Sequence, residues 1–385
     1  MKSDWPTKKL GEVCELIKGT EPGSKSYFDE FEKDRIRFIR VQDLTGKLDN
    51  PKFVSKNLGN LTLVQPEEIL ISFDGTPGIV AKSWSGAISS GIRVIRNIKP
   101  EVLKDFLFYY LQTSELQEVI KFYTTGVTIL HAPRAIPHIE IPIPSIKKQQ
   151  EIVERLDAIK KAQGLNDKQI ALADELFQNL LHRELDPKGK KWEVKKLGEI
   201  TVFKRGPFGG SLKKEIFVEH GYKIYEQKNV INNDFTIGNY FINEKKYREM
   251  IDFAIHPSDL IISCSGTIGK VVKVPEKVHP GIINQALLKI TPLKNIIIGD
   301  FLKFVIETSV IQERLTANTR GSAIRNVASV KEIKRIKIPL PPIETQRKIV
   351  EKLSAIQDYK KKLLEQKQKL QELFESVLHK SISQR

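Results

Sequence analysis

Apolar and polar positions follow a pattern along this chain that predicts short strands and then helices, and the whole pattern occurs twice. The short apolar runs are bounded by turn residues such as Asp74-Gly75 and Ser265-Gly266, which is typical of strands. One apolar stretch with helical spacing follows each set of runs, over about residues 102–123 and 297–317. The predicted strands cover residues 35–41, 68–73, 88–96, 222–225, 260–264 and 281–290.

A long helix is predicted after each of two proline segments, IPIP (residues 141–144) and IPLPP (residues 338–342). Proline favours extended backbone and prevents a helix from starting earlier. Apolar residues then keep an a/d spacing, which indicates a coiled-coil seam rather than a helix lying on a sheet. Each helix of about 36 residues would span roughly 54 Å and could act as a spacer, unless it packs only on its own domain. The seam residues are Ile152, Leu156, Ile159, Phe177, Ile349, Leu353, Ile356 and Phe374.

The second half of the chain repeats the first. WPTKKLGEVCELIKG (residues 5–19) matches WEVKKLGEITVFKRG (192–206), and EILISFDGTPG (68–78) matches DLIISCSGTIG (259–269). DFLFYYLQTSELQ (105–117) matches DFLKFVIETSVIQ (300–312), and residues 139–183 share 18 identities in 45 positions with residues 336–380. The helical ends are therefore alike and the middles have diverged. This is expected if each middle recognises something different, and drift in loops is the alternative.

These patterns together predict an α+β fold. It consists of two repeated β-rich domains with helices, separated by two long helices that form an antiparallel coiled coil in a pseudo-two-fold arrangement. The predicted boundaries are 1–146 for the first domain, 147–190 for the first helical spacer, 191–343 for the second domain and 344–385 for the C-terminal spacer.

Composition adds a class of partner. The 385 residues are enough for two or three domains, and 40% hydrophobic residues suffice for buried cores. A formal net charge of +16 favours a polyanion, nucleic acid first, although a lysine-rich proteome would give the same balance. Cys14 and Cys264 have no CxxC spacing and the chain starts without an apolar signal segment, which predicts a cytoplasmic protein. No run of 18 apolar residues occurs, so no membrane contact is expected.

No catalytic or metal-binding signature stands out. The sequence has no Walker A run, no GxGxxG after a strand, no NPPY or DPPY tetrapeptide and no histidine cluster with metal spacing. His182 and His379 are equivalent in the repeat and are expected to pack at helix ends. Asp186-Pro187 with Glu193 is faintly similar to a metal-dependent nuclease motif, but the spacing is short and Pro6 replaces Glu193 in the other copy. We therefore expect no catalytic residue and no metal site.

Candidate contacts to DNA lie in two pairs of loops and at basic turns. Glycines in the Gly-Thr loops (residues 72–78 and 263–269) allow close approach of the backbone, and Thr hydroxyls can bind phosphate oxygens. A tight β-turn explains the glycines equally well. Side chains around residues 42 and 227–229 are of the types that read base edges. The candidates are Lys18, Gln42, Gly75, Thr76, Thr125, Thr128, Arg134, Lys204, Arg205, Gln227, Lys228, Gly266, Thr267, Arg320, Ser322 and Arg325.

The chain resembles the specificity (S) subunits of type I restriction–modification systems. The resemblance covers essentially the whole chain and rests on three paired motifs. They are the W-x-x-K-K-L-G-E openings, the G-T-x-G loops and the proline segments followed by I-x-x-Q and the helices E-R-L-D-A-I and E-K-L-S-A-I. The proline–Gln–helix element is fairly specific, and its duplication at this spacing is very specific.

The resemblance implies a non-catalytic, sequence-specific DNA-binding subunit. Each of its two target-recognition domains would read one half of a gapped, bipartite site in double-stranded DNA. The helices would set the gap and dock methyltransferase (M) subunits, usually two, and motor-nuclease (R) subunits would join. S-adenosylmethionine would belong to the M subunits, and ATP and magnesium to the R subunits, so no cofactor is expected in this chain. The loops differ between the copies, for example Asp74 against Ser265, so the two half-sites should differ.

Two other classes of function remain open from the residues alone. A protein–protein scaffold with incidental charge would show no sequence-dependent DNA binding. An enzyme that acts on nucleic acid by itself would show activity with only a metal or a methyl donor.

Overall fold

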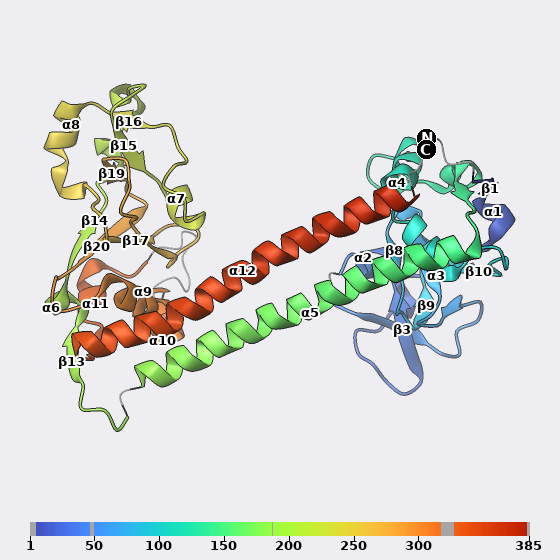
Figure 1. Ribbon diagram of the computed structural model, residues 1–385, viewed down its shortest axis with the longest axis horizontal. Coiled ribbons are helices and arrows are strands. Elements are labelled where there is room, and N and C mark those ends of the chain that lie inside the picture. The colour runs from blue at the N-terminus through green and yellow to red at the C-terminus, as the bar shows by residue number, and fades with distance from the viewer. Residues whose placement is uncertain (1–4, 47–49, 187, 317–326, 383–385) are drawn as a thin grey trace. The chain divides into compact units, whose positions relative to one another are not determined.

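The computed structural model describes residues 5–46, 50–186, 188–316 and 327–382 (Figure 1). The chain forms two compact units. Unit 1 comprises Met1–Lys168 and Leu364–Arg385, and unit 2 comprises Gln169–Leu363. Each unit contains a domain of mixed strands and helices together with a segment of two long helices, α5 (Ile146–Leu185) and α12 (Ile343–Ile382). The predicted α+β class, with two repeated domains and two long helices, is confirmed.

Two small sheets form the domain of unit 1. The first sheet is antiparallel and has the order β2-β10-β6-β8, and the second has the order β4-β3-β9-β5 with β3 and β9 parallel. The strands of the first sheet are β2 (Glu15–Lys18), β10 (Ile92–Arg96), β6 (Ile69–Ser72) and β8 (Val80–Ala81). Those of the second are β4 (Lys52–Ser55), β3 (Arg35–Ile39), β9 (Gly86–Ile88) and β5 (Leu63–Val64). Two further pairs join β1 (Thr7–Lys9) to β12 (Glu140–Pro142) and β7 (Asp74–Gly75) to β11 (Leu130–His131).

Unit 2 repeats this topology. Its first sheet has the order β14-β20-β17-β18, and its second has the order β16-β15-β19 with β15 and β19 parallel. The strands are β14 (Thr201–Arg205), β20 (Leu287–Pro292), β17 (Leu260–Ser263), β18 (Val271–Lys273), β16 (Phe241–Ile242), β15 (Tyr222–Tyr225) and β19 (Gly281–Ile283). The pair of β13 (Glu193–Lys196) and β21 (Lys337–Leu340) corresponds to β1 and β12.

Both units also contain short helices. They are α1 (Leu10–Val13) and α2 (Val41–Leu44) in unit 1, and α6 (Leu197–Ile200), α7 (Gln227–Ile231), α8 (Glu244–Glu249) and α11 (Val330–Lys334) in unit 2.

Two predicted strands are each divided between the two sheets. Residues 88–96 and 281–290 were expected to be single strands, but the first contains the end of β9, a turn and β10, and the second contains β19, a turn and the start of β20. The turn is closed by hydrogen bonds from the Ile92 amide to the Ser89 carbonyl (3.0 Å) and from the Leu287 amide to the Asn284 carbonyl (3.1 Å). A continuous apolar run in the sequence does not indicate the residue at which the chain leaves one sheet for the other.

Each helix predicted before the proline segments is in fact two helices. They are α3 (Lys104–Tyr110) with α4 (Ser114–Phe122), and α9 (Gly299–Glu307) with α10 (Ser309–Thr316). A threonine stands at each break. The Thr113 hydroxyl donates to the Tyr110 carbonyl (2.8 Å), and the Thr308 hydroxyl donates to the Val305 carbonyl (2.7 Å). Because these hydroxyls compete for the carbonyls at the end of the first helix, the chain can turn before the next helix begins.

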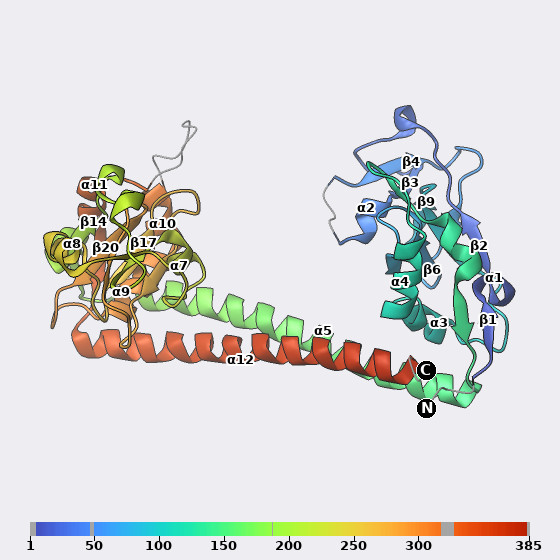
Figure 2. The ribbon, with the colours of Figure 1, turned by 90° about the horizontal axis from the view of Figure 1, so that it is seen from above.

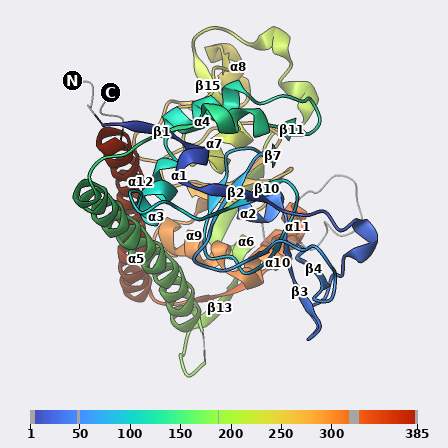
Figure 3. The ribbon, with the colours of Figure 1, turned by 90° about the vertical axis from the view of Figure 1, so that its right-hand side faces the viewer.

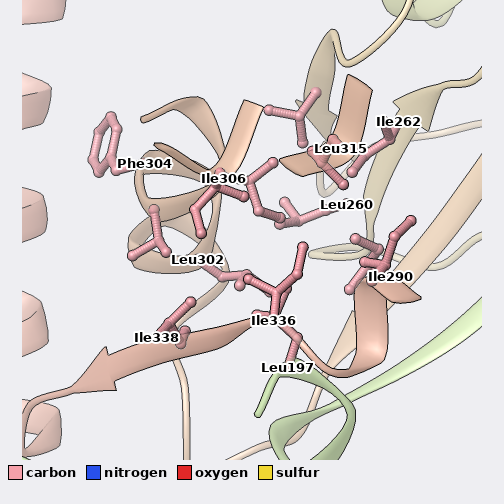
Figure 4. Packing of buried hydrophobic residues seen from close by; sticks show 14 of the residues in the cluster. Leu197, Leu260, Ile262, Ile290, Leu302, Phe304, Ile306, Leu315, Ile336 and Ile338 are labelled. Atoms are coloured by element: carbon pink, nitrogen blue, oxygen red, sulfur yellow. The ribbon is translucent and has the colours of Figure 1, made fainter. Parts of the chain in front are cut away.

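Alternate residues of the central strand β6 face two different cores. Ile69 and Ile71 pack with α3 and α4, while Leu70 packs with Ile39 and Ile88 of the second sheet. The domain of unit 1 therefore has three layers, namely helices, first sheet and second sheet (Figure 2). In unit 2 the helix-facing core gathers side chains from β17, β20, α6, α9 and β21 (Figure 4).

The long helices pair in antiparallel fashion in both units. In unit 1 Gln163 donates to the Leu370 carbonyl (3.3 Å) and Lys367 pairs with Asp167 (2.8 Å). In unit 2 Lys360 pairs with Asp174 (2.5 Å) and Lys352 pairs with Glu184 (3.0 Å). No helix among the described residues is long and apolar enough to cross a bilayer.

The predicted seam contacts the domains as well as the partner helix, so the expectation of a coiled-coil seam alone is corrected. The Phe374 ring lies 6.0 Å from that of Tyr109 in unit 1, and the Phe177 ring lies 5.8 Å from that of Phe304 in unit 2. The a/d pattern is satisfied because either neighbour removes the apolar stripe from water. Phe177 and Ile356 are half-buried, and the buried seam residues are Ile152, Leu156, Ile159, Ile349, Leu353 and Phe374.

A buried glutamine connects the start of each long helix to its domain. Gln149 in α5 donates to the carbonyls of Glu101 (2.8 Å) and Pro144 (2.9 Å) and accepts from the Leu103 amide (2.7 Å). Gln346 in α12 makes the three equivalent bonds, to Ile296, Pro341 and Ile298. Both glutamines are 0% exposed. This network explains why a glutamine follows the proline segment in both copies.

We expect Asn166→Leu to raise the stability of the chain. Asn166 lies in α5, is 1% exposed, and neither polar atom of its side chain has a hydrogen-bond partner. Leucine, as at the repeat-equivalent Leu363, would remove a desolvation cost of about 1–3 kcal/mol. Thermal unfolding followed by circular dichroism measures the change in midpoint. The control is Gln163→Leu, which loses two hydrogen bonds and should give no gain. A lower midpoint for Asn166→Leu would contradict the expectation.

Candidate nucleic-acid interface

Several of the candidate DNA contacts meet at one edge of the first sheet in each unit. β2 and β6 both run antiparallel to β10, so their C-terminal ends lie at the same edge. Lys18 at the end of β2 and the Gly-Thr loop after β6 are thus brought together although about fifty residues separate them. In unit 2 Arg205 at the end of β14 and the loop after β17 have the same relation.

The Gly-Thr loops are tight turns with exposed tips. Gly75 and Gly266 have φ angles of 79° and 62°, a region that favours glycine. The buried Ser72 hydroxyl donates to the Thr76 carbonyl (2.6 Å) and accepts from the Ile79 amide (2.9 Å), which fixes the turn. Thr76 and Thr267 are exposed. The glycines therefore serve the turn, and the turn presents the threonine hydroxyls to solvent.

A second, half-buried interaction holds each Gly-Thr loop against the helix pair before the proline segment. Gln117 of α4 donates to the carbonyls of Gly78 (2.9 Å) and Leu111 (3.0 Å). Gln312 of α10 donates to those of Gly269 (3.1 Å) and Ile306 (2.8 Å). This role of the two glutamines was not predicted. The sequence did indicate it, because both glutamines are the last residues of the matched segments 105–117 and 300–312.

The short helices α2 and α7 lie beside the Gly-Thr loops. A Cβ on Gly75 would lie 3.7 Å from Cγ1 of Val41, and Gln227 donates to the carbonyls of Ser265 and Thr267. The amide of Gln227 is thus used to hold the loop. Gln42 and Lys228 follow Val41 and Gln227 in the chain, and both are exposed.

Asn229 belongs to the predicted base-reading stretch but does not face solvent. It is 1% exposed, and its amide donates to the carbonyls of Asp234 (2.9 Å) and Ile237 (2.8 Å). It occupies the place of the buried Asp43 in unit 1, which pairs with Arg37 (3.0 Å) and Arg40 (3.2 Å). Asn229 is a structural residue of the turn after α7 in this structure.

In unit 1 the segment between α4 and the proline segment pairs with the Gly-Thr loop. β11 lies against β7, with Leu130 opposite Gly75 and His131 opposite Asp74 (Figure 3). The His131 Nδ1 atom lies 2.7 Å from the Asp74 carboxylate, and the amides and carbonyls of Thr125 and His131 bond reciprocally at 2.8 Å. Thr125, Thr128 and Arg134 are exposed. Of the candidates in the matching segment of unit 2, Arg320, Ser322 and Arg325 lie outside the described residues.

The basic residues at the first turn differ in their surroundings. Lys18 is exposed. Lys204 pairs with Asp252 (2.7 Å) and its ammonium lies 4.7 Å from the centre of the Phe253 ring. Burial raises the pKa of the Cys264 thiol to about 12, and the neighbouring Arg205 guanidinium lowers that pKa in part. Arg205 therefore has a partner inside the domain, whereas Lys18 presents its charge outward.

Two repeat-equivalent cavities lie apart from these loops. One, in unit 1, has a volume of about 750 Å³ and is lined by Trp5, Glu115 and His379 among others. The other, in unit 2, has a volume of about 430 Å³ and is lined by His182, Arg314 and Lys337 among others. His379 pairs with Glu115 (3.1 Å). Both histidines are exposed at cavity walls near helix ends, so the expectation that they pack there is wrong.

The two units are thus two copies of one α+β domain, and each presents exposed loops of different sequence at the same sheet edge. The profile of one family, described as "Type I restriction modification DNA specificity domain", matches residues 2–173 and 189–373. The chain belongs to this family of specificity subunits, and the resemblance in its motifs is confirmed.

The chain is also similar to curated specificity subunits along nearly its whole length. The Type I restriction enzyme MjaVIII specificity subunit of Methanocaldococcus jannaschii is 24% identical over 401 residues, covering 98% of this chain and 91% of the relative. The EcoBI specificity subunit of Escherichia coli is 23% identical over 390 residues, covering 92% and 80% respectively.

Solved structures share the fold. The S subunit of a type I system from M. genitalium aligns with a TM-score of 0.58 at 18% identity, covering 98% of this chain and 96% of that chain. A structure from work on complex assembly and conformational transition of the type I R-M system aligns with a TM-score of 0.63 at 19% identity, covering 99% and 98%.

We expect Gly19→Ala to destabilise unit 1. A Cβ on Gly19 would lie 2.1 Å from the Ser89 carbonyl oxygen and 2.5 Å from that of Ile88, so the backbone must move. A loss of about 1–3 kcal/mol is typical of such overpacking. The matched control is Gly11→Ala, since a Cβ there meets nothing within 4 Å. Urea unfolding measures both variants, and equal midpoints for the two would contradict the expectation.

Proposed function

We propose that this chain is the DNA-recognition subunit of a type I restriction–modification complex and that each domain reads one half of a gapped, bipartite target. The observation that carries the proposal is the repeated sheet edge. The scaffold is the same in both units, down to the glutamines that hold the loops, while the exposed side chains differ. One framework with two different loop sets suits two different half-sites.

Recognition would combine two kinds of contact. Exposed basic side chains such as Lys18 and Arg134 would bind phosphates and release counterions, which sets position without sequence information. Gln42 and Lys228, at the first turns of α2 and α7, have the side-chain types that reach base edges in the major groove. No catalytic step is assigned to the chain.

The long helices would set the gap between the half-sites and dock the methyltransferase subunits, two in the complete complex. A groove of about 330 Å³ between α5 and α12 in unit 2 supports the docking role. Its lining includes the large apolar side chains of Leu172, Leu176 and Tyr359, which are 62%, 55% and 49% exposed. Such a patch on a charged helix surface is typical of an interface with another protein.

The chemistry of the complex would reside in its partners. S-adenosylmethionine would bind to the methyltransferase subunits, and ATP and magnesium would bind to the motor-nuclease subunits. The residues of this chain would select the sequence at which those subunits act.

The test is co-expression of the tagged chain with its host's adenine methyltransferase subunit, followed by capture of the complex and methylome sequencing. We expect co-purification and methylation at a single two-part motif. Capture without any motif would contradict recognition by the loops. No capture and no methylation would reject the proposal in favour of a scaffold for other proteins.

We expect a change of one base pair in the gap to abolish most specific binding. One added pair rotates a half-site by roughly 34–36° about the DNA axis, so both domains could not engage together. Binding of the purified complex to duplexes with the native gap and with gaps one pair longer or shorter measures the effect. A matched duplex with the native gap but altered gap bases is the control and should bind like the native target. Equal affinity for all gap lengths would reject the spacer role.

We expect Leu172→Glu and Leu176→Glu to reduce capture of the methyltransferase subunit at least ten-fold, since each would place a charge in an interface that excludes water. Both side chains are exposed, so the fold should be retained. Ala171→Glu, on a neighbouring exposed face of α5, is the matched control. Co-purification yield and thermal unfolding are the measurements. Unchanged capture by both leucine variants would exclude this groove from the docking surface.

A further inference from the structure

An apolar tip projects from the loop that pairs with the Gly-Thr loop of unit 1. It consists of Val127, Ile129 and Leu130, of which Val127 is fully exposed and the others are 57% and 39% exposed. These residues lie between α4 and the proline segment, immediately beside the candidate contacts Thr128 and Arg134. Three exposed apolar side chains within four residues call for a functional explanation.

The base of this loop is held rigidly although its tip is exposed. Thr125 and His131 exchange two backbone hydrogen bonds of 2.8 Å, and the Ala132 amide donates to the Phe73 carbonyl (2.7 Å). Gly126 has a φ of 103°, and a Cβ there would lie 2.1 Å from the Ile129 carbonyl oxygen. Any side chain at residue 126 would therefore clash with the backbone of this turn. A rigid base can press a side chain against a ligand without a large loss of conformational entropy.

The position of the tip favours DNA over a protein as its partner. Leu130 pairs with Gly75, and the exposed Thr76 follows Gly75 directly, so the tip lies beside the Gly-Thr loop. The nearby acidic side chain, Asp74, lies 3.8 Å from the Arg93 guanidinium, which reduces its repulsion of phosphates. Arg134 is exposed close by in the chain. Proteins that kink DNA combine basic side chains with apolar wedges that enter between base pairs.

We propose that Val127 and Ile129 act as a wedge that partly unstacks one base step at the half-site bound by unit 1. This inference rests on the proposed function and goes beyond it, because it adds deformation of the DNA to contact with its bases. Deformation makes the affinity depend on how easily the step opens, so sequence is also read at a position that no polar side chain touches. In the second copy the stretch after the matching glycine reads Ser322-Ala323-Ile324-Arg325, so only one of the two wedge positions is a large apolar residue there, and we assign the wedge to one half-site only.

The test uses the complex with the methyltransferase subunit and duplexes of its target that carry 2-aminopurine at successive positions through both half-sites and their flanks. The fluorescence of 2-aminopurine rises when the base unstacks. The adenine that is methylated is left unlabelled, because the methyltransferase itself extrudes that base. We expect a several-fold rise at one step, in one half-site. The double variant Val127→Asn with Ile129→Asn should lose that rise.

The matched control is Val202→Asn, because Val202 is an exposed valine as well (56%) but lies in β14 of unit 2. It should leave the fluorescence unchanged. A wild-type complex that binds its target specifically but shows no rise at any step would overturn the wedge and leave the proposed function intact. Persistence of the rise in the double variant would overturn it as well. Loss of methyltransferase capture by the double variant would assign the tip to a protein interface instead, and absence of any specific binding would remove both proposals.

Discussion

The buried amides of Gln149 and Gln346 are the interaction on which the rest of each unit depends. Each amide makes three hydrogen bonds at the point where extended backbone becomes a forty-residue helix. A buried amide without partners would cost about 1–3 kcal/mol, so few other placements of the helix relative to the domain can compete. The direction of the helix fixes which apolar side chains meet the domain and which meet the partner helix.

Hydrogen bonds from glutamine amides to the backbone also hold the candidate interface in place. Glutamine side chains, here Gln117 and Gln312, again bind backbone carbonyls, and in doing so they hold the Gly-Thr loops in one shape. The loop tips are then free to vary without loss of their geometry. A protein that must read different sequences with one fold needs this separation, because substitutions at an exposed tip have little effect on a core that does not include it.

Much of this could be predicted from the residues. The duplication, the α+β class, the long helices and their apolar stripes all follow from periodicity, since helical and strand spacings are local properties of the chain. The loops that carry exposed glycine and threonine were also identified. The sequence indicated less about which groups the candidate DNA-binding side chains contact within the protein. Gln227 and Arg205 are of the types that bind DNA, yet in the structure each has a partner within its own domain.

The sequence by itself determined that two similar units exist, where their helices lie and which family they belong to, because repetition and periodicity need no knowledge of contacts. Only the tertiary structure decided that residues 88–96 leave one sheet for another, that a seam residue such as Phe374 also packs on a domain, and that β7 and β11 bring two distant loops together. Those outcomes depend on pairs of residues far apart in the chain. The contact that satisfies a buried polar or apolar group is chosen by the whole fold, and a local pattern does not contain it.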